Sequence, residues 1–199
     1  MLRPGYGRVQ IMGIAMPRKK KFDTKSHTKD IAASWARERP DLDLNDYLYL
    51  LYVMRVGRIL DKLDEIQCRR QYGISGADMR VLFALRRSGE PFARRPTDLY
   101  RALLITSGAI TKQVDRLEKL ELVRRLPDPT NAGGFLVQAT AEGVRIADTA
   151  IGALAGGTPL ASAHSSLNAS ERRQLIKLCE KLLLDLEADL PAAEGDGGE

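Results

Sequence analysis

Hydrophobic residues recur at helical spacing through most of the 199-residue chain. A short helix is expected over 29–38, ended by Pro40, followed by a helix of about seven turns from Asp43 or Asn45 to near Gln71. The long helix carries an apolar stripe with steps of three and four residues: Leu48, Leu51, Tyr52, Val56, Ile59, Leu60, Leu63 and Ile66. Such a stripe needs a partner, and a second copy of the chain is the best candidate.

The middle of the chain predicts three short helices followed by a hairpin. The expected helices run from the capping box at Ser75 to Gly89, from Pro96 to Leu104, and from the cap at Thr106 to Leu120. Alternation over 122–126 and 135–139, separated by a turn rich in Pro, Asn and Gly, predicts two paired strands. This order is typical of a winged helix-turn-helix.

Two further helices are expected after the hairpin. Thr140 caps one that ends at Gly156, and the capping box Asn168-Ala-Ser-Glu171 opens another with leucines along one side. We therefore expect a mainly α (α+β) fold, a winged helix-turn-helix with long flanking helices that form a dimerisation region. The expected parts are a disordered basic arm (1–29), dimerisation and ligand helices (30–74), a DNA-binding region (75–145), C-terminal dimerisation helices (146–190) and a disordered acidic tail (191–199).

The charge distribution agrees with this division. Residues 1–29 carry a net charge of +7 and residues 75–145 of +4, whereas 30–74 and 146–199 carry −1 and −5. A basic centre between acidic flanks suits a protein that meets phosphates with one region and assembles through the others. No apolar run is long enough for a membrane span and no secretory signal is seen, so we expect a cytoplasmic protein with no membrane partner.

Composition argues against enzyme and metal chemistry. The chain has two histidines and two distant cysteines, and it lacks nucleophile-elbow, phosphate-loop and metal-ligand spacings. We expect no catalytic residue, no metal and no cofactor.

The helix expected after Thr106 carries the strongest functional signal. Ile110, Val114 and Leu117 face the core, while small and polar residues face outward, so that its first turn can approach DNA closely. Lysine, glutamine and arginine have the donor and acceptor groups that read base edges. The predicted DNA contacts are Thr106, Ser107, Gly108, Ala109, Thr111, Lys112, Gln113 and Arg116, with Asn131 from the hairpin turn.

The segment from Ser75 to Gly143 resembles the core of the MarR family of transcription regulators. The likeness rests on Ser-Gly-Ala-Asp-Met-Arg-Val-Leu-Phe-Ala-Leu85, Val114-Asp-Arg-Leu-Glu118, Leu122-Val-Arg-Arg-Leu-Pro-Asp-Pro129 and Ala139-Thr-Ala-Glu-Gly143. It implies an obligate homodimer that binds a palindromic operator in double-stranded DNA and is often released by a small phenolic or aromatic acid. The family's wing usually carries an Asp-Arg pair, but Asn131 and Ala132 stand here.

A second likeness concerns the effector. Ser34-Trp-Ala-Arg37, on a helix before the long one, looks like the urate-responsive branch of the family, in which the tryptophan helps enclose the ligand. Arg80 replaces that branch's ligand-site aspartate, which favours an aromatic ligand with a carboxylate. The predicted ligand residues are Trp35, Tyr47, Tyr52, Arg55 and Arg80. In the alternative, Trp35 pins its helix to the dimer core, and Arg55 and Arg58, one turn apart, pair with Asp61 or with the partner chain.

Two other functions stay open at this point. The neutral wing tip and the basic arm would suit an architectural protein that tolerates many DNA sequences. Arg69 and Arg70 could lower the pKa of the Cys68 thiol, as a cysteine-based redox sensor requires. We expect Cys179 to be a small core residue of the last helix.

Overall fold

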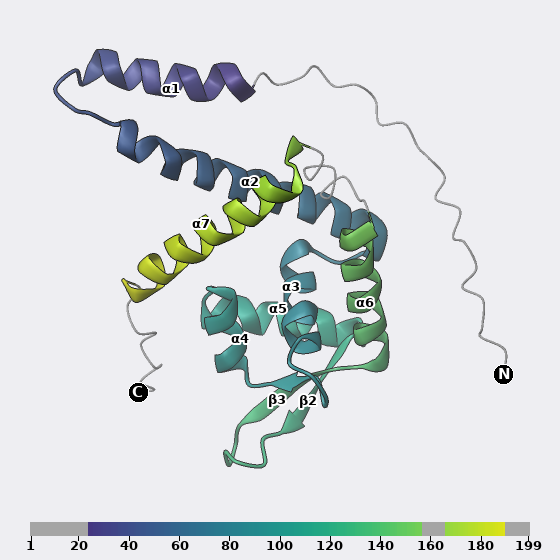
Figure 1. The fold of residues 1–199 in the computed structure, drawn as a ribbon. Helices are drawn as coiled ribbons and strands as arrows, with labels where there is room; N and C mark the ends of the chain where they lie inside the picture. The colour runs from purple at the N-terminus through teal and green to yellow at the C-terminus, as the bar shows by residue number, and fades with distance from the viewer. Residues whose placement is uncertain (1–23, 157–165, 190–199) are drawn as a thin grey trace. The chain divides into compact units, whose positions relative to one another are not determined.

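The computed structural model describes residues 24–156 and 166–189. Its elements, all but β1 labelled in Figure 1, are α1 (Thr24–Glu38), α2 (Asn45–Tyr72), α3 (Gly76–Arg86), β1 (Ala93–Arg94), α4 (Pro96–Leu103), α5 (Ser107–Lys119), β2 (Val123–Pro127), β3 (Phe135–Ala139), α6 (Ala141–Gly156) and α7 (Ala169–Ala188). The chain divides into two units, 1–55 and 56–199, and the boundary falls within α2.

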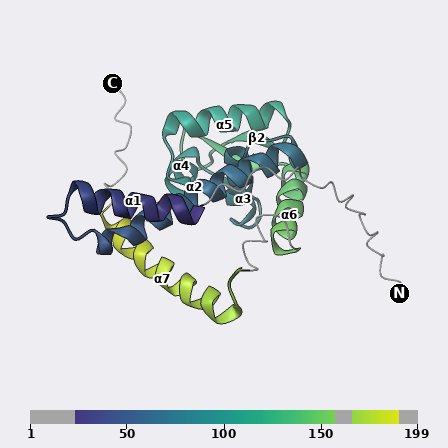
Figure 2. The same ribbon diagram turned by 90° about the horizontal axis from the view of Figure 1, so that it is seen from above.

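Helix α3 forms the centre of the second unit. Ser75 caps it, because the Ser75 Oγ accepts a hydrogen bond from the Asp78 backbone N–H at 3.0 Å. Met79, Leu82 and Leu85 are fully buried. The helix lies between α5 and α6, as Figure 2 shows, and it also contacts α4 and β3. The core of the expected winged helix-turn-helix is therefore built around α3.

The three strands form one antiparallel sheet in the order β1-β3-β2. The β2–β3 hairpin pairs Val123 with Ala139 at one end and Pro127 with Phe135 at the other, so the predicted hairpin is confirmed. Strand β1 pairs Ala93 with Gln138 and was not predicted. Two residues are too few to show an alternating pattern in the sequence.

The flanking helices differ in part from the expectation. Helix α1 begins at Thr24, so residues 24–29 of the expected disordered arm are helical, while 1–23 and the expected acidic tail lie outside the described residues. The expected boundary at 145 falls inside α6, whose buried Ala147 and Ala150 belong to the same core as α3.

Helix α7 has the predicted capping box at Asn168 but buries none of its residues. Cys179 is exposed there, so its prediction as a core residue is wrong for the single chain. Within 24–156 and 166–189, no helix combines the length and apolar character needed to cross a membrane.

Gly143 lets α6 begin directly against Leu122, the residue that precedes β2. A Cβ at this position would lie 2.1 Å from the Leu122 carbonyl oxygen, which already accepts a hydrogen bond from the Thr140 N–H at 3.0 Å. At Gly152, on the same helix, a Cβ would meet no atom within 4 Å. The two glycines therefore form a matched pair for mutation.

We expect Gly143→Ala to lower the free energy of unfolding by roughly 1–3 kcal/mol, because the backbone must shift to admit the methyl group. Gly152→Ala should raise it by roughly 0.5–1 kcal/mol, since alanine is the better helix former. Urea unfolding followed by circular dichroism measures both. Equal stability of the two variants would contradict the close approach at Gly143.

Candidate nucleic-acid interface and effector cavity

Helix α5 presents a small, polar first turn to solvent. The Thr106 Oγ1 accepts a hydrogen bond from the Ala109 N–H at 3.2 Å and caps the helix, as predicted. Ile110, Val114 and Leu117 are buried. The remaining outward residues of the predicted contact set are exposed, except for the half-buried Ala109: Thr106, Ser107, Gly108, Thr111 and Lys112.

The prediction that Gln113 lies on the exposed face is wrong. Its side chain is buried, and its Oε1 has no hydrogen-bond partner among the described residues. Gln113 follows Ile110 by three residues and precedes Leu117 by four, which is the spacing of the buried face itself. Gln113 is therefore not a candidate for contacting bases.

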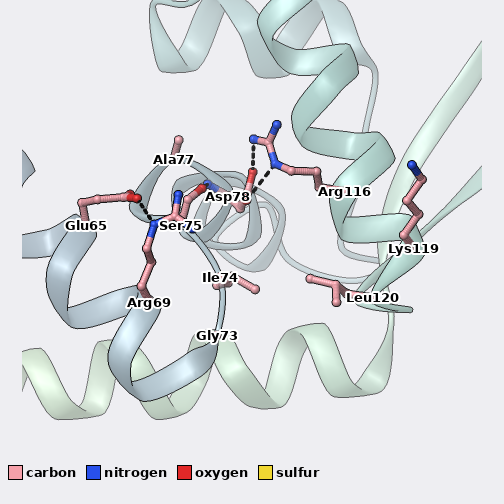
Figure 3. A pocket seen from close by; sticks show the side chains of 10 residues that line it. All are labelled: Glu65, Arg69, Gly73, Ile74, Ser75, Ala77, Asp78, Arg116, Lys119 and Leu120. Carbon is pink, nitrogen blue, oxygen red and sulfur yellow. Dashed lines mark hydrogen bonds and ion pairs between the residues drawn. The ribbon is translucent and has the colours of Figure 1, made fainter.

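Arg116 is exposed, but its guanidinium is held by α3. It donates to the Asp78 carboxylate with its Nη2 at 2.6 Å and its Nε at 3.2 Å (Figure 3). This hydrogen bonding raises the pKa of Arg116. Asp78 is buried, so its carboxylate depends on this partner. The pair fixes α5 against the start of α3, a role that sequence reasoning missed because Asp78 was assigned to a capping box.

The start of α3 is also tied to α2, through Glu65. The Glu65 carboxylate accepts a hydrogen bond from the Gly76 N–H at 2.7 Å and pairs with Arg69 (Figure 3). The bond from Gly76 is the largest cause of the lowered pKa of Glu65. Carboxylates thus tie the start of α3 to α2 on one side and to α5 on the other.

The wing, formed by β2, β3 and the turn between them, has no charged residue at its tip (131–134), and hydrogen bonds to Asp128 hold its base. The Arg95 Nε donates to the Asp128 Oδ2 at 2.6 Å, and the Thr130 N and Oγ1 donate to the Asp128 Oδ1 at 2.9 Å each. The bond from Arg95 is the main reason why the pKa of Asp128 is lowered to about 2. Asn131 is exposed at the tip, which backbone hydrogen bonds close. Arg95 has no sequence signal for this role.

A separate cavity of about 510 Å³ lies within the first unit, between α1 and the start of α2. Trp35 and Tyr47, both predicted ligand residues, line it with apolar side chains such as Leu48 and Leu51. Arg39 supplies a cation in the lining, and it is hydrogen-bonded to Asp41 at 2.8 and 2.6 Å. The cavity therefore offers aromatic and apolar walls with one guanidinium, and Asp43 also belongs to its lining.

The other predicted ligand residues lie elsewhere. Tyr52 and Arg55 are not part of the cavity lining. The Arg80 Nη1 donates to the Asp61 Oδ1 at 3.2 Å and to the Asp64 Oδ2 at 3.3 Å, ion pairs that were not predicted for this residue. Arg39 was not predicted, although its place just after the Trp35 helix could have suggested it.

Comparison with known proteins decides the family. A model described as MarR family matches residues 72–132. The HTH-type transcriptional regulator PecS of Dickeya dadantii (strain 3937) is 35% identical over 115 residues, which cover 57% of this chain and 68% of PecS. The chain belongs to the MarR family. It is accordingly a transcription regulator of that family rather than an enzyme.

Other MarR-family proteins and solved structures also match the chain. The multiple antibiotic resistance protein MarR of Salmonella typhimurium is 32% identical over 75 residues, 38% of this chain and 50% of that protein. A MarR mutant from E. coli complexed with operator DNA has a TM-score of 0.59 and 27% identity, covering 70% of this chain and 97% of that one. AbsC from Streptomyces coelicolor, with a TM-score of 0.63 and 19% identity, covers 74% and 98% and supports the fold.

The thiol of Cys68 in this MarR-family chain is not activated. Cys68 is 3% exposed, and its Sγ donates to the Asp64 Oδ1 at 3.5 Å. Burial, with Asp64 and Glu65 adding to it, raises the pKa of Cys68 to about 12. The prediction that Arg69 and Arg70 lower this pKa is wrong, because residues next to each other in a helix point in different directions. The structure argues against redox sensing through Cys68.

In a Cys179→Ser variant, which leaves Cys68 as the only thiol, we expect almost no alkylation by iodoacetamide at pH 8. A thiol with a pKa of about 12 is protonated there, and the fold excludes the reagent. Mass spectrometry with and without denaturant measures the labelling, and the denatured protein is the positive control. Rapid labelling of the folded variant would restore the redox hypothesis.

Proposed function

We propose that this protein is a homodimeric, sequence-specific DNA-binding repressor, released from a palindromic operator by a small aromatic or phenolic acid. The observation that carries the proposal is the exposed face of the first two turns of α5, which combines small residues with Lys112 on a winged helix-turn-helix. At Gly108 a Cβ would meet no atom within 4 Å, so nothing in the fold itself requires glycine there. A close approach by DNA explains it.

The proposed base and backbone contacts come from the start of α5 and from the wing. They are Thr106, Ser107, Gly108, Ala109, Thr111, Lys112 and Asn131. Arg116 orients α5 through Asp78 in this proposal, and Gln113 makes no contact. The E. coli MarR mutant complexed with operator DNA supports binding of the same kind, since it shares the fold over 70% of this chain.

The flanking helices supply the dimer interface in this proposal. The described part of α7 exposes large apolar side chains that a single chain leaves in water, among them Leu175, Leu178 and Leu186. Helix α2 exposes Val56, Ile59 and other members of its stripe in the same way. Two such helices per chain are best covered by a second copy.

The effector site in this proposal is the cavity lined by Trp35, Tyr47 and Arg39. Its aromatic walls suit a ring, and the guanidinium of Arg39 can exchange Asp41 for the carboxylate of a ligand. Release requires that the ligand bind more tightly to a state in which the two recognition helices are wrongly spaced for successive major grooves.

Operator binding is tested by fluorescence anisotropy at physiological salt. We expect the full chain to prefer the DNA upstream of its own gene over a scrambled duplex by about a thousandfold or more. Lys112→Gln should weaken operator binding by about 5- to 150-fold, which corresponds to roughly 1–3 kcal/mol for a lost groove contact. The control is Lys119→Gln, at the other end of α5, which removes the same single positive charge. This variant should bind the operator with an affinity within about twofold of the wild type.

Two outcomes would contradict this proposal. Equal affinity for operator and scrambled DNA would favour the architectural alternative, which the neutral wing tip suits. A monomeric mass in sedimentation equilibrium would remove the proposed interface. Loss of the dimer in Lys112→Gln would show that its effect is structural.

The effector cavity is tested through Trp35, the only tryptophan in the chain. Titration with salicylate and related aromatic acids should change its fluorescence, because the ring lines the cavity. Tyr47→Ala should weaken this binding by at least tenfold, whereas Tyr49→Ala, which alters an exposed tyrosine outside the lining, should not. An unchanged affinity in Tyr47→Ala, or no response to any acid, would overturn the assignment of the cavity.

A further inference from the structure

Within residues 75–145, three arginines differ from the others in their surroundings. Of the ten arginines in 75–145, a stretch that the structure describes throughout, six pair with carboxylates and Arg124 donates to the Gln138 side chain. The other three, Arg87, Arg94 and Arg101, have no carboxylate partner among the described residues. The Cζ of Arg101 lies 6.0 Å from the centroid of the Tyr100 ring.

These three arginines line one hollow. It has a volume of about 530 Å³ and lies where the end of α3, strand β1 and helix α4 meet. Arg87 follows α3, Arg94 belongs to β1 and Arg101 lies in the last turn of α4, so three separate segments bring the cations together. All three are exposed. Asp98 is the one acidic residue in the lining, which leaves a net charge of +2.

Three guanidinium groups around one hollow repel each other unless an anion lies between them. Each group carries a planar fork of donors that matches the oxygens of an oxyanion, and together they offer more donors than one carboxylate can accept. A phosphate group, with several free oxygens and a negative charge, satisfies such a set better. We propose that Arg87, Arg94 and Arg101 form a phosphate-binding site, separate from the exposed face of α5.

Two sources of phosphate fit this site. The backbone of DNA is the first, because Arg94 lies two residues before α4, and α4 packs against α5 in the helix-turn-helix. The second is a free phosphorylated small molecule. The first source rests on the proposed DNA binding, and the second is independent of it.

The experiment compares the full-length wild type with two triple variants. In one, Arg87, Arg94 and Arg101 are changed to Gln; in the other, all three are changed to Lys, which keeps the charge but removes the fork of donors. Arg145→Gln is the control, because Arg145 is exposed on α6 and paired with Glu142. Thermal unfolding checks that each variant is folded.

The first measurement is the dependence of DNA affinity on salt. For a DNA source we expect the triple Gln variant to lower the slope of log K against log[salt] by about 0.9 for each arginine that contacts a phosphate. The control should keep the wild-type slope. The triple Lys variant should keep most of the slope but bind more weakly than the wild type.

The second measurement is calorimetric titration with inorganic pyrophosphate in the absence of DNA. Binding that is lost in the triple Gln variant and kept in Arg145→Gln supports the small-molecule source, even if the wild type binds no DNA. A wild type that binds DNA, together with variants whose slope and pyrophosphate binding equal those of the wild type, overturns this site and leaves the proposed function standing.

Discussion

The packing of α3 against its neighbours is the constraint on which the second unit depends. Its buried side chains contact α5 on one side and α6 on the other, so the place of the recognition helix follows from the core of α3. The ion pair between Asp78 and Arg116 also fixes how α5 is oriented against α3. A buried carboxylate is costly without a partner, and removing Arg116 would leave that charge in place. The orientation of α5 is therefore coupled to the start of α3 by charge as well as by apolar contact.

The turn of the wing is held by polar contacts to one carboxylate instead of by buried apolar side chains. Its tip lacks charged side chains, and its shape comes from hydrogen bonds that converge on the Asp128 carboxylate. Arg95, which precedes α4, supplies one of them, so the base of the hairpin is tied to the first helix of the helix-turn-helix. Because the low pKa of Asp128 keeps it ionised above about pH 2, this link persists through the physiological range. The wing is thus positioned firmly even though its tip offers no cation.

Sequence reasoning succeeded where the signal is local. Thr106, Thr140 and Asn168 were recognised as helix caps because capping depends on residues within one turn. It failed where a side chain contacts a distant segment, and where the face of a helix on which a residue lies decides its contacts. The partner that matters for Cys68 is Asp64, four residues earlier on the same face, and not the adjacent arginines. The Asp78–Arg116 and Arg95–Asp128 pairs join residues more than thirty positions apart, which no local pattern reveals.

The same distinction governs how the charge of the DNA-binding region is interpreted. The net charge of residues 75–145 gives the sign of the surface but not the place where an anion can bind. Most of the arginines there are held by acidic partners, so their charge is neutralised locally and orients helices and the wing. The cations of residues 75–145 without a carboxylate partner in the described part of the chain are Lys112 and Lys119 on α5, Arg124, and the three arginines around the hollow beside α4. The net charge of a region therefore overstates the number of cations that its fold leaves available to an anion.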